Sequence, residues 1–180
     1  MKKTGAMTLR DIERLLVEAS RLSNHRHFVI AGSLSAIGAI MNPPLDMVMS
    51  RDVDLYPKLD PARGFKEIAS ALSEGSDFHL QNGFYADPIS PAILALPSDW
   101  ESRAIPITMK NGIVATFIDI NDMAISKLMR SEENDIRWVR AAFDAGIASA
   151  DEILARLSKV DNALPEDFER ARQSLSMLAK

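Results

Sequence analysis

Hydrophobic positions at the start of the chain follow first a helical and then a strand-like spacing. Between 9 and 22 they recur every three or four residues, which predicts an amphipathic helix that begins at a capping box of Thr8 and Asp11. The apolar run 27–31 predicts a buried strand, and the apolar stretch 34–41 predicts a buried helix that the following prolines end. The chain therefore opens as helix, strand, tight turn and helix.

The middle of the chain alternates short apolar runs with turn residues. These runs predict strands over 52–56, 84–86, 104–109 and 113–118, and a helix over 61–72. Asn111 and Gly112 separate the last two strands and form a dipeptide that favours a tight turn. We therefore expect these two strands to form a β-hairpin.

From Asp122 onward the hydrophobic pattern is helical. It predicts helices over 123–130, 135–145, 150–159 and 165–178. Ser149 suits the N-cap of the third of these helices, and Pro165 suits the first position of the fourth. The whole pattern predicts an α+β fold, a small mixed β-sheet flanked by helices. We expect residues 1–121 to form the α/β core with its N-terminal helix, and residues 122–180 to form a helical C-terminal extension packed on that core.

Composition narrows the class of protein. With 180 residues, 47% hydrophobic and 26% charged, and a net charge of −4, the chain can bury one full core and is unlike a disordered protein. It has no cysteine, which excludes disulfides, thiolate metal sites and thiol catalysis. Neither a leader peptide nor an apolar run long enough to span a membrane is readable, so we expect a cytoplasmic protein with no membrane partner. The mild acidity disfavours a broad nucleic-acid surface but leaves a local basic groove open.

Asp52 and Asp54 are the first candidates for chemistry. Residues two apart in a strand face the same side, so these carboxylates project together, with Cα atoms roughly 6.6 Å apart. Adjacent carboxylates repel each other and favour a cation between them, and hard oxygen ligands suit Mg²⁺. The alternative is the solvated face of an edge strand, although aspartate is depleted in strands. Val53 and Leu55 are expected to face the core.

Gly32 and Ser33 supply the context for the aspartates. Glycine lets the backbone turn tightly beside a ligand, and the start of the following helix presents unpaired amides and a hydroxyl to phosphate groups. An ordinary helix N-cap explains the pair equally simply. The order of the features favours a site: strand, Gly-Ser turn, helix, then Asp-x-Asp on the next strand.

These motifs resemble those of the nucleotidyltransferase superfamily, in particular its minimal members such as the AbiEii-like abortive-infection toxins and related families. Residues 32–36 match the first motif and residues 50–55 the second, and the resemblance covers about 28–145. It implies that Gly32 and Ser33 hold a nucleoside triphosphate and that the two aspartates of the second motif bind Mg²⁺. Arg51, inside the second motif, is expected to contact the nucleotide.

A third carboxylate is implied by the same resemblance. It comes from the strand after the next helix, and Asp87 occupies that place. Asp119, at the end of the strand predicted over 113–118, is the alternative ligand. Chain order favours Asp87, while a strand-end or turn position would explain either residue without a metal.

A lysine and an aspartate in the helical part complete the resemblance. Lys127 and Asp135 occupy their places, which implies a catalytic, phosphate-binding lysine and a nucleotide-binding aspartate that orients basic groups. A solvated helix face is the other explanation for Lys127. The basic residues usual in these families just before the aspartate are replaced here by the acidic stretch 132–134, which weakens the case for tight triphosphate binding.

Histidines and tryptophans offer less specific sites. His25 and His27 share a face in an extended chain and could bind zinc with His79, but this spacing is loose. Trp100 and Trp138 could each stack a nucleobase beside a neighbouring arginine. For Trp138 the surrounding helical apolar pattern favours core packing instead.

Two functions compete at this point. The first is a Mg²⁺-dependent nucleotidyltransferase that moves a nucleoside monophosphate from a triphosphate to a hydroxyl of RNA or protein, in a toxin–antitoxin or phage-defence setting with a cognate partner protein. The second is a catalytically silent interaction or regulatory protein on the same fold. Phosphoryl transfer through an aspartyl nucleophile fits poorly, because the segment before Asp52 is half polar.

Overall fold

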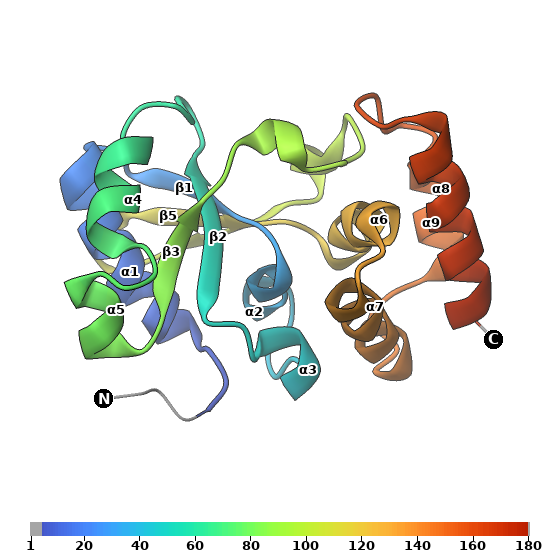
Figure 1. Cartoon of the computed structure of the whole chain (residues 1–180), viewed down its shortest axis with the longest axis horizontal. Helices are drawn as coiled ribbons and strands as arrows, with labels where there is room; N and C mark the ends of the chain where they lie inside the picture. The colour runs from blue at the N-terminus through green and yellow to red at the C-terminus, as the bar shows by residue number, and fades with distance from the viewer. Residues whose placement is uncertain (1–4, 180) are drawn as a thin grey trace.

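The computed structural model describes residues 5–179, which form a mixed sheet covered by helices on both faces (Figure 1). The strands are β1 (His27–Ile30), β2 (Asp52–Pro57), β3 (Tyr85–Pro88), β4 (Ile105–Thr108) and β5 (Val114–Phe117), in the order β3-β2-β1-β5-β4. β1 is antiparallel to β2 and parallel to β5, β2 is parallel to β3, and β4 is antiparallel to β5. This confirms the α+β class with a small mixed sheet.

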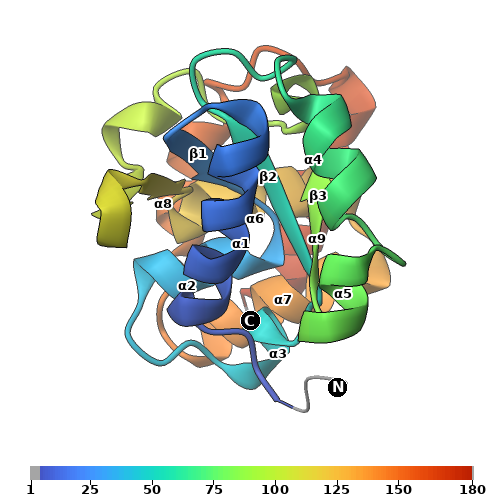
Figure 2. The same cartoon turned by 90° about the vertical axis from the view of Figure 1, so that its left-hand side faces the viewer.

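The helices form two groups. They are α1 (Leu9–Ser23), α2 (Ala36–Ala39), α3 (Leu45–Val48), α4 (Phe65–Leu72), α5 (Asp77–Asn82), α6 (Ile120–Arg130), α7 (Glu133–Asp144), α8 (Ala150–Leu157) and α9 (Pro165–Leu178). Figure 2 looks onto the face of the sheet that α1, α4 and α5 cover. The other group lies beyond the opposite face, where α6 contacts α7, α8 and α9 (Figure 1). The division into a core over 1–121 and an extension over 122–180 stays a prediction.

Local signals at the helix ends are confirmed. The backbone N–H of Thr8 donates to the Asp11 carboxylate over 2.8 Å, as a capping box requires. The Ser149 hydroxyl accepts from the backbone N–H of Glu152 over 3.3 Å, and Pro165 is the first residue of α9. These interactions lie within one turn of the chain, which is why the sequence predicts them well.

Two predicted helices are four residues shorter than expected, and two short helices were missed. The stretch 34–41 folds as a 3₁₀ turn over Ser33–Ser35 followed by α2, and the backbone is extended again at Ile40 ahead of the prolines. The helix predicted over 61–72 begins only at Phe65, because Gly64 before it has a left-handed backbone (φ 82°). Helices α3 and α5 have four and six residues, too few for a hydrophobic period to show.

The core follows the predicted alternation along the strands. Val53 and Leu55 are fully buried on the side of β2 opposite the aspartates. The hairpin between β4 and β5 is confirmed, with positive φ at Asn111 and Gly112. Among residues 5–179, no helix is both long and apolar enough to cross a membrane.

Candidate active site

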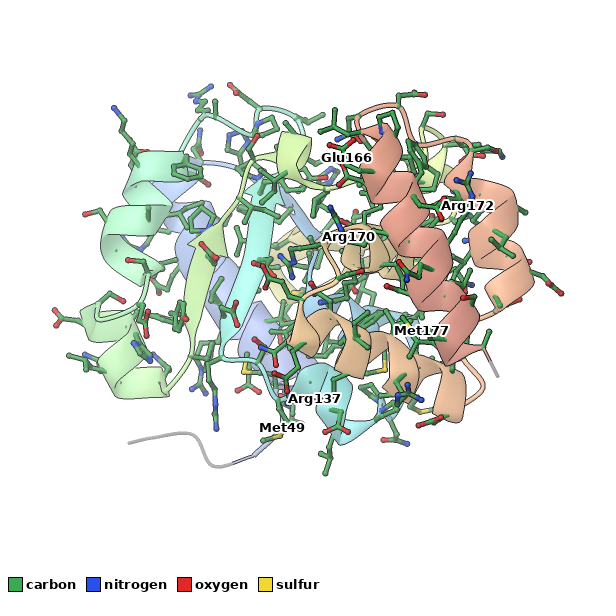
Figure 3. All side chains as sticks on the ribbon, turned by 45° about the vertical axis from the view of Figure 1, so that its right-hand side comes forward. Met49, Arg137, Glu166, Arg170, Arg172 and Met177 are labelled. Atoms are coloured by element: carbon green, nitrogen blue, oxygen red, sulfur yellow. The ribbon has the colours of Figure 1, made fainter. Side chains whose placement is uncertain are left out.

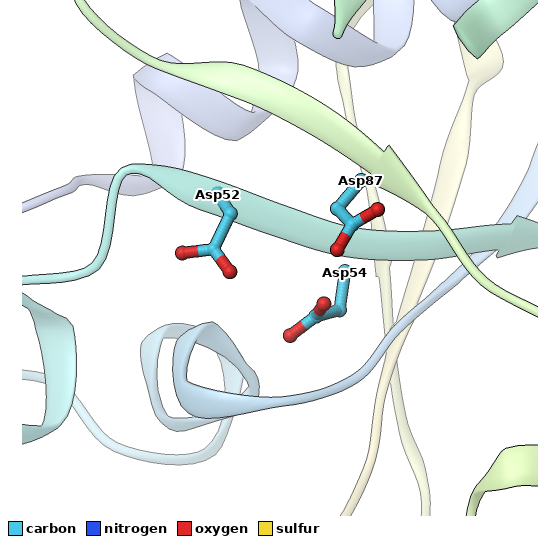
Figure 4. Close-up of side chains that lie close together, drawn as sticks. All are labelled: Asp52, Asp54 and Asp87. Carbon is cyan, nitrogen blue, oxygen red and sulfur yellow. The ribbon is translucent and has the colours of Figure 1, made fainter. Parts of the chain in front are cut away.

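Three carboxylates converge on one side of the sheet, at β2 and β3 (Figure 4). Asp52 and Asp54 lie two apart in β2, and the parallel register sets Asp54 opposite Asp87 of β3. Each of the three offers a carboxylate oxygen within 4.8 Å of the others. In the described part of the chain this is the one cluster of three or more acidic or imidazole groups with metal-binding spacing.

The electrostatics of the cluster favour a cation. Burial, together with the negative charges of Asp52 and Asp87, raises the pKa of Asp54 to about 7. The pKa of Asp87 is raised as well, by partial burial and by the charge of Asp52. The Ser50 hydroxyl donates to the Asp52 carboxylate and orients it. An all-oxygen set whose members repel one another fits a hard divalent ion such as Mg²⁺.

Gly32 is required by the close approach of Asp54. Its backbone (φ 61°, ψ −151°) is one that essentially only glycine adopts. A Cβ atom at this position would lie 1.7 Å from Asp54 Oδ2. The predicted Gly-Ser turn therefore lies directly against one of the predicted metal-binding carboxylates, that of Asp54.

Ser33 is held from two helices on the far side of the turn. Its carbonyl accepts from Trp138 Nε1 over 3.1 Å, and its hydroxyl accepts from Lys127 Nζ over 3.3 Å. Trp138 is 1% exposed, so core packing is confirmed for this side chain. The ammonium of Lys127 also lies 5.2 Å from the centre of the Trp138 ring.

Lys127 is buried and is paired with Asp135. The two groups are 3.1 Å apart, and both are almost without solvent exposure. Burial lowers the pKa of Lys127, although the charge of Asp135 opposes that shift. Burial alone would raise the pKa of Asp135, but hydrogen bonding from Arg130 and the charges of both cations lower it below its usual value. Asp135 thus pairs with both Lys127 and Arg130, while its role in nucleotide binding stays a prediction.

Arg130 is a site residue that the sequence reasoning missed. Its Nε and Nη2 donate to the two oxygens of Asp135 over 2.7 and 2.6 Å. A signal was present, because Arg130 follows Lys127 by three residues and so lies on the same face of α6. Arg130 supplies a basic group beside Asp135, which the acidic stretch 132–134 does not. Within that stretch, Glu132 caps α7 and Glu133 pairs with Arg137.

A cavity of about 340 Å³ opens beside the carboxylates. Gly32, Asp54, Lys127, Arg130 and Arg170 line it, together with an apolar wall contributed by the segment 89–95 and by α6. The cavity lining therefore combines Asp54 of the aspartate cluster with three cationic side chains and an apolar wall. Cavities of about this size bind small ligands in many proteins.

Neither the aspartate cluster nor the lining of the cavity includes the remaining candidates. Asp119, the alternative third ligand, caps α6 and pairs with Arg156 over 2.7 Å, away from the aspartate cluster. Arg51 directly precedes β2, and its Nη1 is buried without a hydrogen-bond partner among residues 5–179. His25, His27 and His79 form no cluster of metal-binding spacing within that same range.

Comparison with known proteins identifies one family. A protein-family model described as "Nucleotidyltransferase of unknown function (DUF6036)" matches residues 8–175. The match runs from the first residues of α1 into α9, so it includes the Gly-Ser turn, the three carboxylates and the cations around the cavity. No curated protein and no solved structure is found to match the chain.

Proposed function

The chain belongs to this family of nucleotidyltransferases of unknown function, and we propose that it is a Mg²⁺-dependent enzyme that transfers a nucleoside monophosphate from a triphosphate to a hydroxyl of RNA or protein. One observation carries the proposal. Asp52, Asp54 and Asp87 meet within 4.8 Å at the turn formed by Gly32 and Ser33, between the strands and the cationic cavity.

The proposed roles follow from the positions of the side chains. The three aspartates would hold Mg²⁺, which when bound would polarise the α-phosphate and offset the charge that develops on it. Ser33 and Lys127 would contact the triphosphate from the other side of the turn.

The reaction proposed is a single displacement at phosphorus. The acceptor oxygen forms a bond to the α-phosphorus, and the bond from that phosphorus to the bridging oxygen of the β-phosphate breaks. Pyrophosphate leaves with the electron pair. The acceptor proton passes to water by way of Asp87, the exposed member of the aspartate cluster.

The test replaces Asp52 and Asp54 by Asn together and follows transfer of labelled nucleotide from each of the four ribonucleoside triphosphates to cellular RNA and protein. We expect the double variant to lose at least about a hundredfold in rate, since it lacks two of three metal ligands. Asp144→Asn, at the exposed end of α7, is the matched control and should keep full activity.

Calorimetry separates this function from the catalytically silent alternative. The active enzyme should bind Mg²⁺ and a triphosphate, and the double variant should not. Equal transfer by wild type and double variant contradicts the proposal. Absence of triphosphate binding by the wild-type protein would favour the silent protein instead.

The biological setting proposed is a toxin–antitoxin or phage-defence pair with a cognate partner protein. Its support is the resemblance of the motifs at 32–36 and 50–55 to those of the AbiEii-like toxins. Induced expression in a bacterial host should then slow growth for wild type and for Asp144→Asn but not for the double aspartate variant. Equal growth of all three strains contradicts this setting but does not bear on the proposed transfer reaction.

A further inference from the structure

The C-terminal helix contributes a cation to the candidate active site. Arg170 lies in α9 and lines the same cavity as Gly32 and Asp54. Figure 3 shows Arg170 and Arg172 leaving α9 on different sides, with Arg170 directed toward the sheet. A segment far outside the recognised motifs therefore reaches the place where a triphosphate is proposed to bind.

Two contacts hold Arg170 next to Arg130. Nη1 of Arg170 donates to the carbonyl oxygen of Met129, the residue before Arg130, and also to the Asp167 carboxylate over 2.9 Å. Asp167 is itself fixed, because it accepts from the backbone N–H of Leu164 over 3.0 Å at the start of α9. Arg170 is thus positioned by the backbone of α6 and by the cap of its own helix.

Both arginines keep donors for a ligand. Arg130 uses Nε and Nη2 on Asp135, which leaves Nη1, and Arg170 uses only Nη1, which leaves Nε and Nη2. Within residues 5–179 these remaining nitrogens have no hydrogen-bond partner. The side chains are 58% and 43% exposed, so an incoming group can reach them. Guanidinium groups with free N–H donors at the mouth of a cavity suit phosphate oxygens.

The positions of the charged groups around the cavity indicate which phosphates of the triphosphate the two arginines contact. Asp54 of the aspartate cluster lines the cavity from β2, and Lys127, Arg130 and Arg170 line it from α6 and α9. An α-phosphate at the carboxylates places the β- and γ-phosphates toward these cations. We infer that Arg170, together with Arg130, binds the β- and γ-phosphates of the triphosphate and neutralises the leaving pyrophosphate. This inference rests on the proposed function.

A purely structural role is the competing explanation. Arg170 donates to a carbonyl in the last turn of α6 and would stabilise that helix end even without a ligand. Arg170→Gln separates the two roles, because the amide can still donate to a carbonyl but carries no charge. Arg172→Gln, exposed on the same helix, is the matched control.

The experiment measures binding by calorimetry in Mg²⁺ with three probes: inorganic pyrophosphate, a non-hydrolysable nucleoside triphosphate and the corresponding monophosphate. We expect Arg170→Gln to weaken pyrophosphate and triphosphate binding about tenfold or more, a typical loss for one charge-assisted contact. Monophosphate binding and the thermal midpoint should stay close to wild type. Arg172→Gln should match wild type with all three probes.

Each result has a defined meaning. Unchanged triphosphate affinity in Arg170→Gln overturns the inference while leaving the proposed function intact. An equal loss for monophosphate and triphosphate also overturns it, since the arginine would then act through the fold. If the wild-type protein binds neither pyrophosphate nor triphosphate, the proposed function itself fails.

Discussion

At the scale of single residues, Gly32 joins two requirements that are separate in the sequence. Its φ and ψ belong to a region that side chains disfavour, and the space where a Cβ would stand is taken by the Asp54 carboxylate. The unusual backbone of Gly32 and the position of the Asp54 carboxylate, a proposed metal ligand, therefore depend on each other. A change here should affect stability and metal binding together.

The first prediction concerns Gly32→Ala. We expect it to lower the free energy of unfolding by about 1–3 kcal/mol and to abolish Mg²⁺ binding, because Asp54 must move away from the new methyl group. Gly146→Ala is the control, since Gly146 also has a positive φ (68°) but no atom lies within 4 Å of the place its Cβ would take. Denaturant unfolding and Mg²⁺ calorimetry measure both effects. Indistinguishable behaviour of the two variants would show that the Asp54 contact is unimportant.

At the scale of elements, α6 connects the site to the C-terminal helices. One part of the helix presents Lys127 and Arg130 to the cavity. Another part contains Asp122, which is fully buried and accepts hydrogen bonds from Arg103 over 2.9 Å and from Arg156 of α8 over 3.0 Å. Helix α6 therefore carries one set of charged residues at the candidate site and another set that stabilises the fold.

Arg156→Met tests the charged residues around Asp122 that stabilise the fold. It removes one of the two partners of Asp122 and the only ion pair described for Asp119 within residues 5–179. We expect a loss of about 2 kcal/mol in unfolding free energy, less than the roughly 3–5 kcal/mol typical when a buried charge loses its sole partner. Arg140→Met, exposed on α7, should change stability little. Mg²⁺ affinity should stay the same in both variants, and a selective loss in Arg156→Met would place this network in the site.

At the scale of the whole molecule, the aspartate cluster couples stability to pH and to metal. The pKa of Asp54 is about 7 in the folded protein, against 3.8 for an unperturbed aspartate. The folded state therefore holds an extra proton between these values, so its stability without metal falls as pH rises through that window. A bound cation replaces the proton, so Mg²⁺ binding should strengthen with rising pH up to about 7.

Thermal unfolding at pH 5 and pH 8, with and without Mg²⁺, checks this coupling. We expect the rise in melting temperature caused by Mg²⁺ to be clearly larger at pH 8, because Asp54 is already ionised there and releases no proton when the cation binds. Below pH 7 the apparent Mg²⁺ affinity should fall by up to about tenfold per pH unit. Asp54→Asn should remove most of the difference between the two pH values. A Mg²⁺ effect of equal size at both would contradict the role of Asp54.

Much of the site could be predicted from local spacing. The two-residue period of a strand sets Asp52 and Asp54 on one face whatever the rest of the fold does, and the Gly-Ser turn follows directly from the end of β1. Helix caps, the hairpin at Asn111 and the longer helices are local in the same sense. Short helices such as α3 and α5 gave no period and were missed.

The sequence by itself determined the strands, the longer helices, the turn and the paired aspartates, because these depend on neighbours within a few residues. Only the tertiary structure placed Asp87, and not Asp119, beside Asp54, through the parallel register of β2 and β3. It also brought Arg130 and Arg170 to one cavity, by packing α9 against α6. Contacts between residues far apart in the chain depend on how whole elements share a core, and no local spacing encodes them.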